Sequence, residues 1–142
     1  TVMRKIPEPL YSQVLDLALK ITNASEADDS VSHAAALLEL QELYRQLDAS
    51  GSSDPFVTET LADYTENDQH AAELYELAIN QSYLFSGEPI HTKKIALALR
   101  RIDLAEPIAA RHLLLQAREE ANTFGDADSV NEADELLALM LE

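Results

Sequence analysis

Histidines and carboxylates are the side chains of this 142-residue chain that could do metal or acid–base chemistry. His33 and His70 occupy equivalent places in two similar segments. A metal site needs ligands that converge from several elements, such as Glu-x-x-His pairs on facing helices. Only the run from Glu88 to His91 has that order, and Pro89 interrupts it. We therefore expect structural roles for the histidines and no metal site.

The other candidates for chemistry are incomplete. His112 follows Arg111 and could titrate near neutral pH, but no nucleophile or orienting carboxylate accompanies it in the sequence. Residues 126–132 alternate oxygen-bearing side chains as a calcium loop does, but lack its central glycine and its last glutamate. We interpret Ser129 and Glu132 instead as a capping box that starts a helix. The sequence therefore predicts a protein that has no cofactor and is not an enzyme. Enzyme activity is the third of the functions considered, after the two binding functions given below.

Charge is distributed along the chain in blocks. The net charge is −16, and residues 21–92 contain Arg45 as their only base against fourteen acids. Residues 93–118 reverse this balance, with six bases and two acids. Nucleic acid and anionic membranes would repel so negative a chain, whereas a basic protein would be attracted. We therefore expect a protein or peptide partner and neither nucleic acid nor a membrane.

The location of the chain is predicted from what the sequence lacks. There is no Cys, which is compatible with a reducing cytosol. No apolar run approaches the roughly 18–20 residues that a membrane span needs. The first residues do not form a recognisable targeting segment. We expect a cytoplasmic protein.

Helices must position these side chains, and one helical segment occurs twice in the sequence. Residues 33–40 and 70–77 lie 37 positions apart and are identical at six of eight places. Periods of roughly 34 to 47 residues are typical of helix-pair solenoids. Apolar spacing, caps and glycines indicate helices and no strands. The expected helices cover about residues 8–21, 30–47, 55–64, 68–86, 90–104, 107–124 and 129–142.

A family resemblance follows from the second helix of each pair. These helices carry a small, a large and another small residue at spacings of four and three, namely Ala71, Tyr75 and Ala78, and again Ala110, Leu114 and Ala117. A leucine followed by a small residue precedes each set, at Leu61-Ala62 and at Leu97-Ala98. The pattern resembles the tetratricopeptide repeat. The resemblance implies an all-α, right-handed α-solenoid of about three helix pairs plus a C-terminal capping helix, as one domain over residues 1–142. A compact helical bundle is the alternative.

The same resemblance implies a protein–protein interaction module, an adaptor or scaffold that binds a partner in a groove lined by the first helix of each pair. The basic side chains on the expected fifth helix could clamp an acidic peptide, or they could pair with the acidic last helix. These cations are Lys93, Lys94, Arg100 and Arg101.

The alternative function is an acidic inhibitor, such as an immunity protein that neutralises a basic toxin, for example a nuclease. Its contact residues would be the acids around the third helix, Asp54, Glu59, Asp63, Glu66 and Asp68. Tyr64 and Tyr83 have polar neighbours and are further interface candidates, because tyrosine suits sites that are half apolar and half wet. Tyr44 and Tyr75 fall on apolar stripes and are expected in the core.

Overall fold

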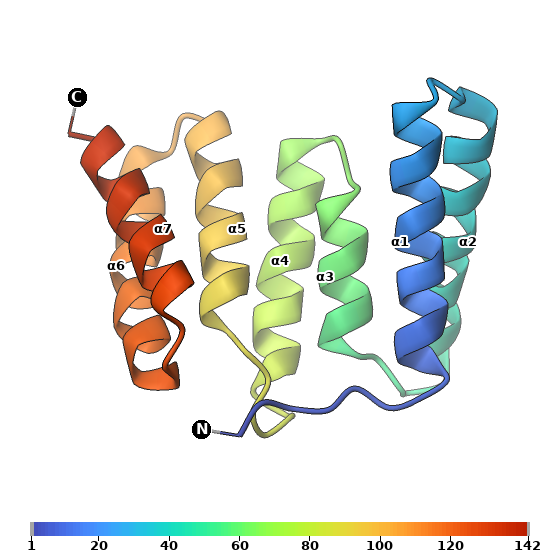
Figure 1. Ribbon diagram of the computed structural model, residues 1–142, viewed down its shortest axis with the longest axis horizontal. Helices are drawn as coiled ribbons and strands as arrows, with labels where there is room; N and C mark the ends of the chain where they lie inside the picture. Colours follow the sequence, from blue (N-terminus) through green and yellow to red (C-terminus); the bar gives the residue numbers. More distant parts are fainter. Residues whose placement is uncertain (1, 142) are drawn as a thin grey trace.

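The computed structural model describes residues 2–141, and all regular secondary structure in this part of the chain is helical (Figure 1). The helices are α1 (Leu10–Glu26), α2 (Ser30–Ala49), α3 (Pro55–Asp63), α4 (Asp68–Ser82), α5 (His91–Asp103), α6 (Pro107–Phe124) and α7 (Ala127–Leu139). The predicted all-α class is confirmed.

Capping side chains explain where several helices begin and end. Asp54 caps α3 by accepting a hydrogen bond from the backbone N–H of Phe56 at 2.9 Å, and Pro55 occupies the first position of the helix. Asn67 caps α4 through its side-chain oxygen in the same way. Gly125 ends α6 with a φ of 87°, in the left-handed region that favours glycine. These boundaries agree with those expected from the sequence.

The start of the last helix differs from the prediction. Its N-cap is Asp126, whose carboxylate accepts hydrogen bonds from both the backbone N–H and the hydroxyl of Ser129, at 3.2 and 2.6 Å. Ser129 therefore lies inside the helix, and the capping box proposed at Ser129 and Glu132 was wrong. Asp126 and Ser129 are both good capping residues, and only Asp126 also has His91 as a second partner.

The end of α4 is also earlier than expected. The helix stops at Ser82, whose hydroxyl donates to the carbonyl of Ala78 at 2.7 Å. The next residues form hydrogen bonds that span three residues and not four. The N–H of Leu84 donates to the carbonyl of Gln81, and the N–H of Phe85 donates to that of Ser82. This narrower turn leads into Gly87, so the glycine closes a loop and not the helix itself.

The helices stand side by side along the long axis of the molecule, with α1 and α2 at one end, α3 and α4 next, and α5, α6 and α7 at the other end (Figure 1). The first apolar cluster joins α1, α2 and α3 and contains Val14, Leu17, Ile21, Ala36, Leu40, Leu43, Val57 and Leu61. The second joins α3, α4 and α5 and contains Ala62, Ala71, Ala72, Tyr75, Ile79 and Leu97. The third joins α5, α6 and α7 and contains Ile95, Ala98, Ala110, Leu114, Ala117 and Ala133. Because α3 and α5 each belong to two clusters, they link successive parts of the core.

An N-terminal arm, residues 2–9, precedes α1. It crosses the lower ends of α3 and α4 and reaches the loop between α4 and α5 (Figure 1). There the backbone N–H of Arg4 donates to the carbonyl of Gly87 at 2.9 Å. The arm thus brings the start of the chain to a loop in its second half.

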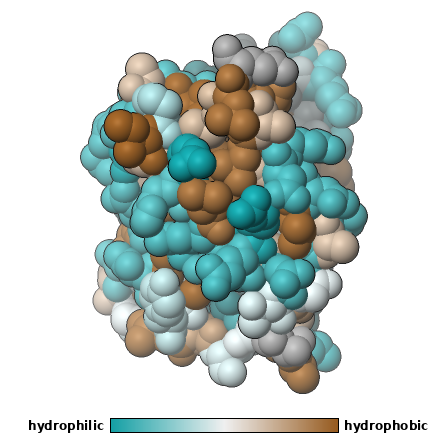
Figure 2. Space-filling model, turned by 90° about the vertical axis from the view of Figure 1, so that its left-hand side faces the viewer, coloured by the Kyte–Doolittle hydropathy of each residue, from teal (hydrophilic) through white to brown (hydrophobic). Residues whose placement is uncertain are grey.

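The C-terminal end of the row carries a mixed surface. Figure 2 shows this end of the molecule, where hydrophobic side chains form a broken strip among hydrophilic ones. The exposed apolar residues of α6, α7 and the segment that follows include Ile108, Leu139 and Leu141. None of the helices in the described part of the chain is both long and apolar enough to traverse a bilayer.

Candidate functional site

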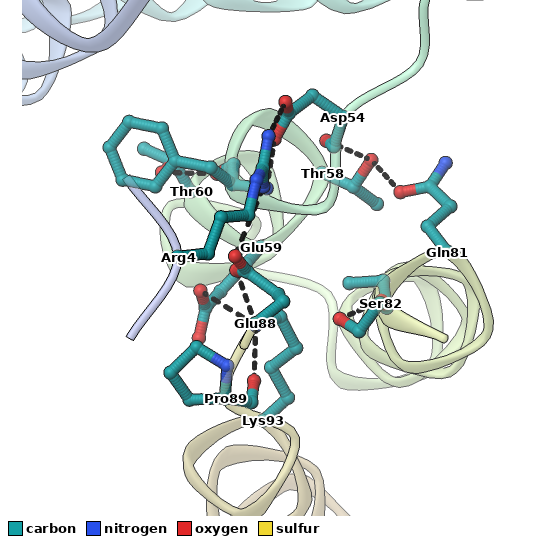
Figure 3. Close-up of polar contacts among 12 residues, drawn as sticks. Arg4, Asp54, Thr58, Glu59, Thr60, Gln81, Ser82, Glu88, Pro89 and Lys93 are labelled. Atoms are coloured by element: carbon teal, nitrogen blue, oxygen red, sulfur yellow. Dashed lines mark hydrogen bonds and ion pairs between the residues drawn. The ribbon is translucent and has the colours of Figure 1, made fainter. Parts of the chain in front are cut away.

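A recess that holds the side chain of Arg4 lies where the arm, the start of α3 and the α4–α5 loop meet (Figure 3). The guanidinium of Arg4 forms two hydrogen bonds with the carboxylate of Asp54 and donates to Oε2 of Glu88 at 3.0 Å. Its central carbon lies 4.1 Å from the centroid of the Phe85 ring. The side chains of Arg4, Asp54 and Glu88 are 9%, 6% and 5% exposed. We call Asp54, Phe85, Gly87 and Glu88 the arginine recess.

Gly87 forms the wall of the recess that meets the arm backbone. Its φ is 80°, in the left-handed region. A β-carbon at this position would lie 2.3 Å from the carbonyl oxygen of Val2 and 2.9 Å from the backbone nitrogen of Arg4. Any other residue would therefore collide with the main chain of the arm.

Lys93 extends the charge network on the other side of Glu88. Its ammonium donates to Oε1 of Glu88 at 3.0 Å and to the carbonyl of Pro89 at 2.6 Å, and it lies 3.7 Å from a carboxylate oxygen of Glu59. The residue is 1% exposed. Burial raises the pKa of Glu59 to about 7, although the Lys93 ammonium opposes that rise. In this position Lys93 offers no free ammonium to an external peptide.

The other three cations of the basic cluster also have partners within the chain. Lys94 is 7% exposed and pairs with Glu120 of α6. Arg101 pairs with Glu76 of α4 and, at 3.2 Å, with Glu106. These contacts join α5 to its two neighbouring helices.

Arg100 closes the turn between α3 and α4. It donates to Asp68 at 3.1 Å and to the backbone carbonyls of Ala62 and Glu66, both at 3.3 Å. The clamp for an acidic ligand that the sequence predicts includes Arg100 with the other three cations. The structure separates the cluster into two sides, with Lys93 and Arg100 directed toward acids of the α3 region and the others toward α4 and α6. Binding of a partner by these four residues stays a prediction.

The predicted interface residues near α3 have varied surroundings. Asp63 accepts a hydrogen bond from the hydroxyl of Tyr75 at 2.6 Å, and Tyr75 is buried in the second cluster as expected. Tyr44 packs against the first cluster, also as expected. Tyr64 packs there too, and its hydroxyl donates to a backbone carbonyl of α1 at 3.3 Å. Tyr83 is 66% exposed and is accessible to a partner.

His91, the last residue of the Glu-x-x-His run, joins α5 to the start of α7. It is 2% exposed, and its Nε2–H donates to Oδ2 of Asp126 at 2.9 Å. Its ring lies against Phe124. The hydrogen bonds from Ser129 and His91 hold the pKa of Asp126 at about 2. Among residues 2–141, no three His, Asp or Glu side chains are grouped so that they could hold a metal ion.

Acidic side chains gather at the first helix pair. An open notch beside the α1–α2 turn is lined by Asp28, Asp29, His33 and Glu66. We call these four residues the acidic notch. It combines acids from the α1–α2 turn with Glu66 of the α3–α4 turn. Glu66 is the member of the predicted α3 acid set that lines the acidic notch. Asp54, Glu59 and Asp68 face cations of this chain, and Asp63 accepts its hydrogen bond from Tyr75.

Ion pairing within the chain leaves the surface with an excess of carboxylates. Of the ten Lys and Arg residues, those in ion pairs are Arg4, Lys20, Arg45, Lys93, Lys94, Arg100, Arg101 and Arg118. Since the chain has 26 acidic residues, most of its carboxylates lack a cation of their own. The electrostatic field around the molecule is therefore negative.

Sequence reasoning missed the arginine recess. The recess and its occupant come from distant parts of the chain, since Arg4 is 50 positions from Asp54 and 84 positions from Glu88. Gly87 directly follows the helix expected over residues 68–86, so the sequence places it at a helix end and does not indicate its contact with the arm. Comparison of the chain with protein-family models, with curated proteins and with solved structures gives no match.

Proposed function

We propose that this chain is a non-enzymatic protein–protein interaction module with a tetratricopeptide-like stack of helix pairs, and that its partner is a protein with a basic surface. The observation that carries this proposal is the excess of surface carboxylates left after the cations pair internally. The single-domain organisation and the cytoplasmic location predicted from the sequence belong to the same proposal.

The helix arrangement supports a stacked architecture. Consecutive helices pack together, and each apolar cluster is shared by three successive helices. In solenoids each repeat buries its apolar face against its neighbours, and the stack exposes an extended surface for binding. We place the partner on the groove lined by α1, α3, α5 and α7, with the acidic notch at its N-terminal end.

The charges support a basic partner over an acidic one. A clamp for an acidic peptide would need free cations, but Lys93 and Lys94 are buried and all four cations of the cluster are ion-paired. Carboxylates of the acidic notch are instead open to solvent. Complementary charge mainly raises association rates and selects among partners.

An inhibitor of a basic toxin, such as a nuclease, is the second candidate, since the same acidic surface favours it. The two functions differ in what happens to the captured partner. An inhibitor abolishes the partner's enzymatic activity in the complex, whereas an adaptor leaves it intact. Assay of the purified complex for nuclease activity therefore separates them.

The test begins with capture of partners by the full chain in its native host, followed by identification and measurement of association rates from low to high salt. We expect the captured protein to be basic and its association to slow as salt rises, because the ions screen the attraction. Salt-independent association with an acidic partner would contradict the proposal.

A pair of charge-neutralised variants locates the contact. Asp28→Asn with Glu66→Gln removes two charges from the acidic notch, and asparagine tolerates the left-handed backbone of residue 28, whose φ is 53°. The matched control, Glu132→Gln with Glu135→Gln, removes two exposed charges from α7. We expect the notch variant to associate about tenfold more slowly and the control to change little. Equal slowing of association in both variants would show that the association rate depends on net charge alone and not on the acidic notch.

A further inference from the structure

We propose that the arginine recess is a recognition site for an arginine side chain on an extended peptide, that Arg4 occupies it as an intramolecular ligand, and that an arginine-bearing segment of the protein partner displaces the arm. This inference rests on the proposed function, since it names the chemistry by which a basic partner is recognised.

The recess contacts the guanidinium from several directions. Asp54 accepts two hydrogen bonds, Glu88 accepts a third, and the Phe85 ring packs against the guanidinium plane. Paired hydrogen bonds to one carboxylate and contact with an aromatic face both favour arginine over lysine. Because both carboxylates are more than nine-tenths buried, the site is shielded from solvent as well as complementary to its occupant.

The recess also accepts the main chain of its occupant. The backbone N–H of Arg4 donates to the carbonyl of Gly87, and the missing side chain of Gly87 leaves room for the carbonyl of Val2. None of these backbone contacts depends on which side chains flank the arginine. An extended peptide from another protein can make the same contacts.

The walls of the recess are held in place without the arm. Asp54 is fixed as the N-cap of α3 by its bond from Phe56 N–H. Glu88 accepts a hydrogen bond from the buried Lys93. The recess is therefore formed by the N-cap of α3 and the loop before α5, and each of its two carboxylates has a partner that does not belong to the arm.

The arm itself has few other anchors near the recess. Val2 and Met3 are 89% and 64% exposed, and Lys5 is exposed as well. A segment held mainly by one side chain opens at a small fraction of the cost of global unfolding. The arm can therefore leave while the helices remain folded.

The experiment measures binding of a synthetic peptide of residues 2–8 to the full chain by calorimetry and by NMR shifts of the Phe85 ring. Occupancy by the arm reduces the apparent affinity of the peptide by the fraction of molecules that are open. We therefore expect Arg4→Ala to bind the peptide at least about tenfold more tightly than the wild-type chain does. Equal binding to both chains would overturn the proposal.

Altered peptides test whether the guanidinium is what is recognised. Replacement of the peptide arginine by citrulline, which keeps the shape and removes the charge, should abolish detectable binding to the Arg4→Ala chain. Replacement by lysine should weaken it by about tenfold, because lysine lacks the planar fork. A citrulline peptide that binds as well as the arginine peptide would refute recognition of the guanidinium.

Altered walls test the location of the site. Adding Asp54→Asn to the Arg4→Ala chain keeps a residue that caps helices well and removes the charge, so peptide binding should fall by about tenfold or more. Asp134→Asn, the same substitution at an exposed ion pair on α7, is the matched control and should leave binding unchanged. Loss of binding in both would mean that net charge, not the recess, attracts the peptide.

Two further results keep the outcome clear. If Arg4→Ala does not fold, the Arg4→Lys variant serves in its place, because it preserves the buried charge. The arginine peptide should bind the Arg4→Lys chain more tightly than it binds the wild-type chain. No binding to a folded Arg4→Lys chain would overturn the proposal. Salt-dependent capture of a basic partner without peptide binding would overturn the arginine recess alone, and leave the proposed function standing.

Discussion

The first apolar cluster and the junction of α3 with α5 are packed with different kinds of side chain. The first cluster is built mainly from large aliphatic side chains of α1, α2 and α3. The second contains three alanines, and beside it the same α3 meets α5 through buried charges, with Lys93 against Glu59 and Glu88. Small residues allow close helix approach, and long charged side chains make the contact between α3 and α5.

The difference shows that a run of basic residues in a sequence does not define a basic surface. Taking two charges out of water costs free energy that their attraction barely returns, so the net gain from a buried ion pair is small. Loss of one partner is nevertheless severe, because the remaining charge stays buried. The two regions should therefore respond differently to substitution and to pH.

Removal of the Lys93 ammonium should have the largest effect. Lys93→Met leaves Glu59 and Glu88 without their shared cation, and loss of one member of a buried pair typically costs about 3–5 kcal/mol. Chemical denaturation at pH 8 measures the loss of unfolding free energy. The loss should be smaller at pH 5, where Glu59 takes up a proton. A loss that is unchanged by pH would mean that Lys93 acts by packing alone.

Truncation in the first cluster should be costly at any pH. Leu40 is fully buried, and Leu40→Ala creates a cavity that typically costs about 2–5 kcal/mol. The same denaturation series at pH 5 and pH 8 should give equal losses, since no titrating group is involved. The exposed Leu38, on the same helix, is the control, and Leu38→Ala should change stability by less than about 1 kcal/mol.

Neutralisation of Glu59 should stabilise the protein at high pH. The folded pKa of about 7 exceeds the ordinary value of 4.5, so the folded chain binds a proton that the unfolded chain has released between these values. Stability contributed by this group therefore falls as pH rises from about 4.5 to 7. Glu59→Gln should remove that slope and add about 1–3 kcal/mol at pH 8, with no gain below pH 4. Parallel stability curves for both chains across pH 4.5 to 7 would rule this out.

A surface ion pair should matter least. Arg118 and Asp134 are about half exposed and lie 3.1 Å apart. Arg118→Ala should cost less than about 1 kcal/mol, and the cost should fall as salt is added. Thermal unfolding at low and high salt provides the measurement. A loss that approaches that of Lys93→Met would remove the contrast between buried and exposed pairs.

Local signals predicted the helices well, because caps and apolar spacing act within a few residues. Asp54-Pro55 and Gly125 set boundaries that the structure confirms. The start of α7 was misplaced, because Ser129 was expected as its N-cap, whereas Asp126 caps the helix and also accepts a hydrogen bond from His91 of α5. The end of α4 was misplaced because a tight turn precedes Gly87.

The candidate site was harder to predict because its contacts are distant in sequence. Asp54 was chosen for its charge alone, and nothing near it in the sequence indicates Arg4 as its partner. The burial of Lys93 and Lys94 was also hidden, since both follow a loop and look like ordinary surface residues of a helix. Pairing between distant charges depends on how the helices stack, and one sequence without structure does not contain that arrangement.

The bridge between Arg4 and Glu88 has a mechanical consequence. Most helices here touch only those next to them, so tension applied at the beginning of such a chain would ordinarily peel off one hairpin at a time. Here the pull would reach the guanidinium of Arg4 first and pass through Asp54 to the start of α3 and through Glu88 to the loop before α5, bypassing α1 and α2. The first hairpin is thus shielded from load until these contacts rupture.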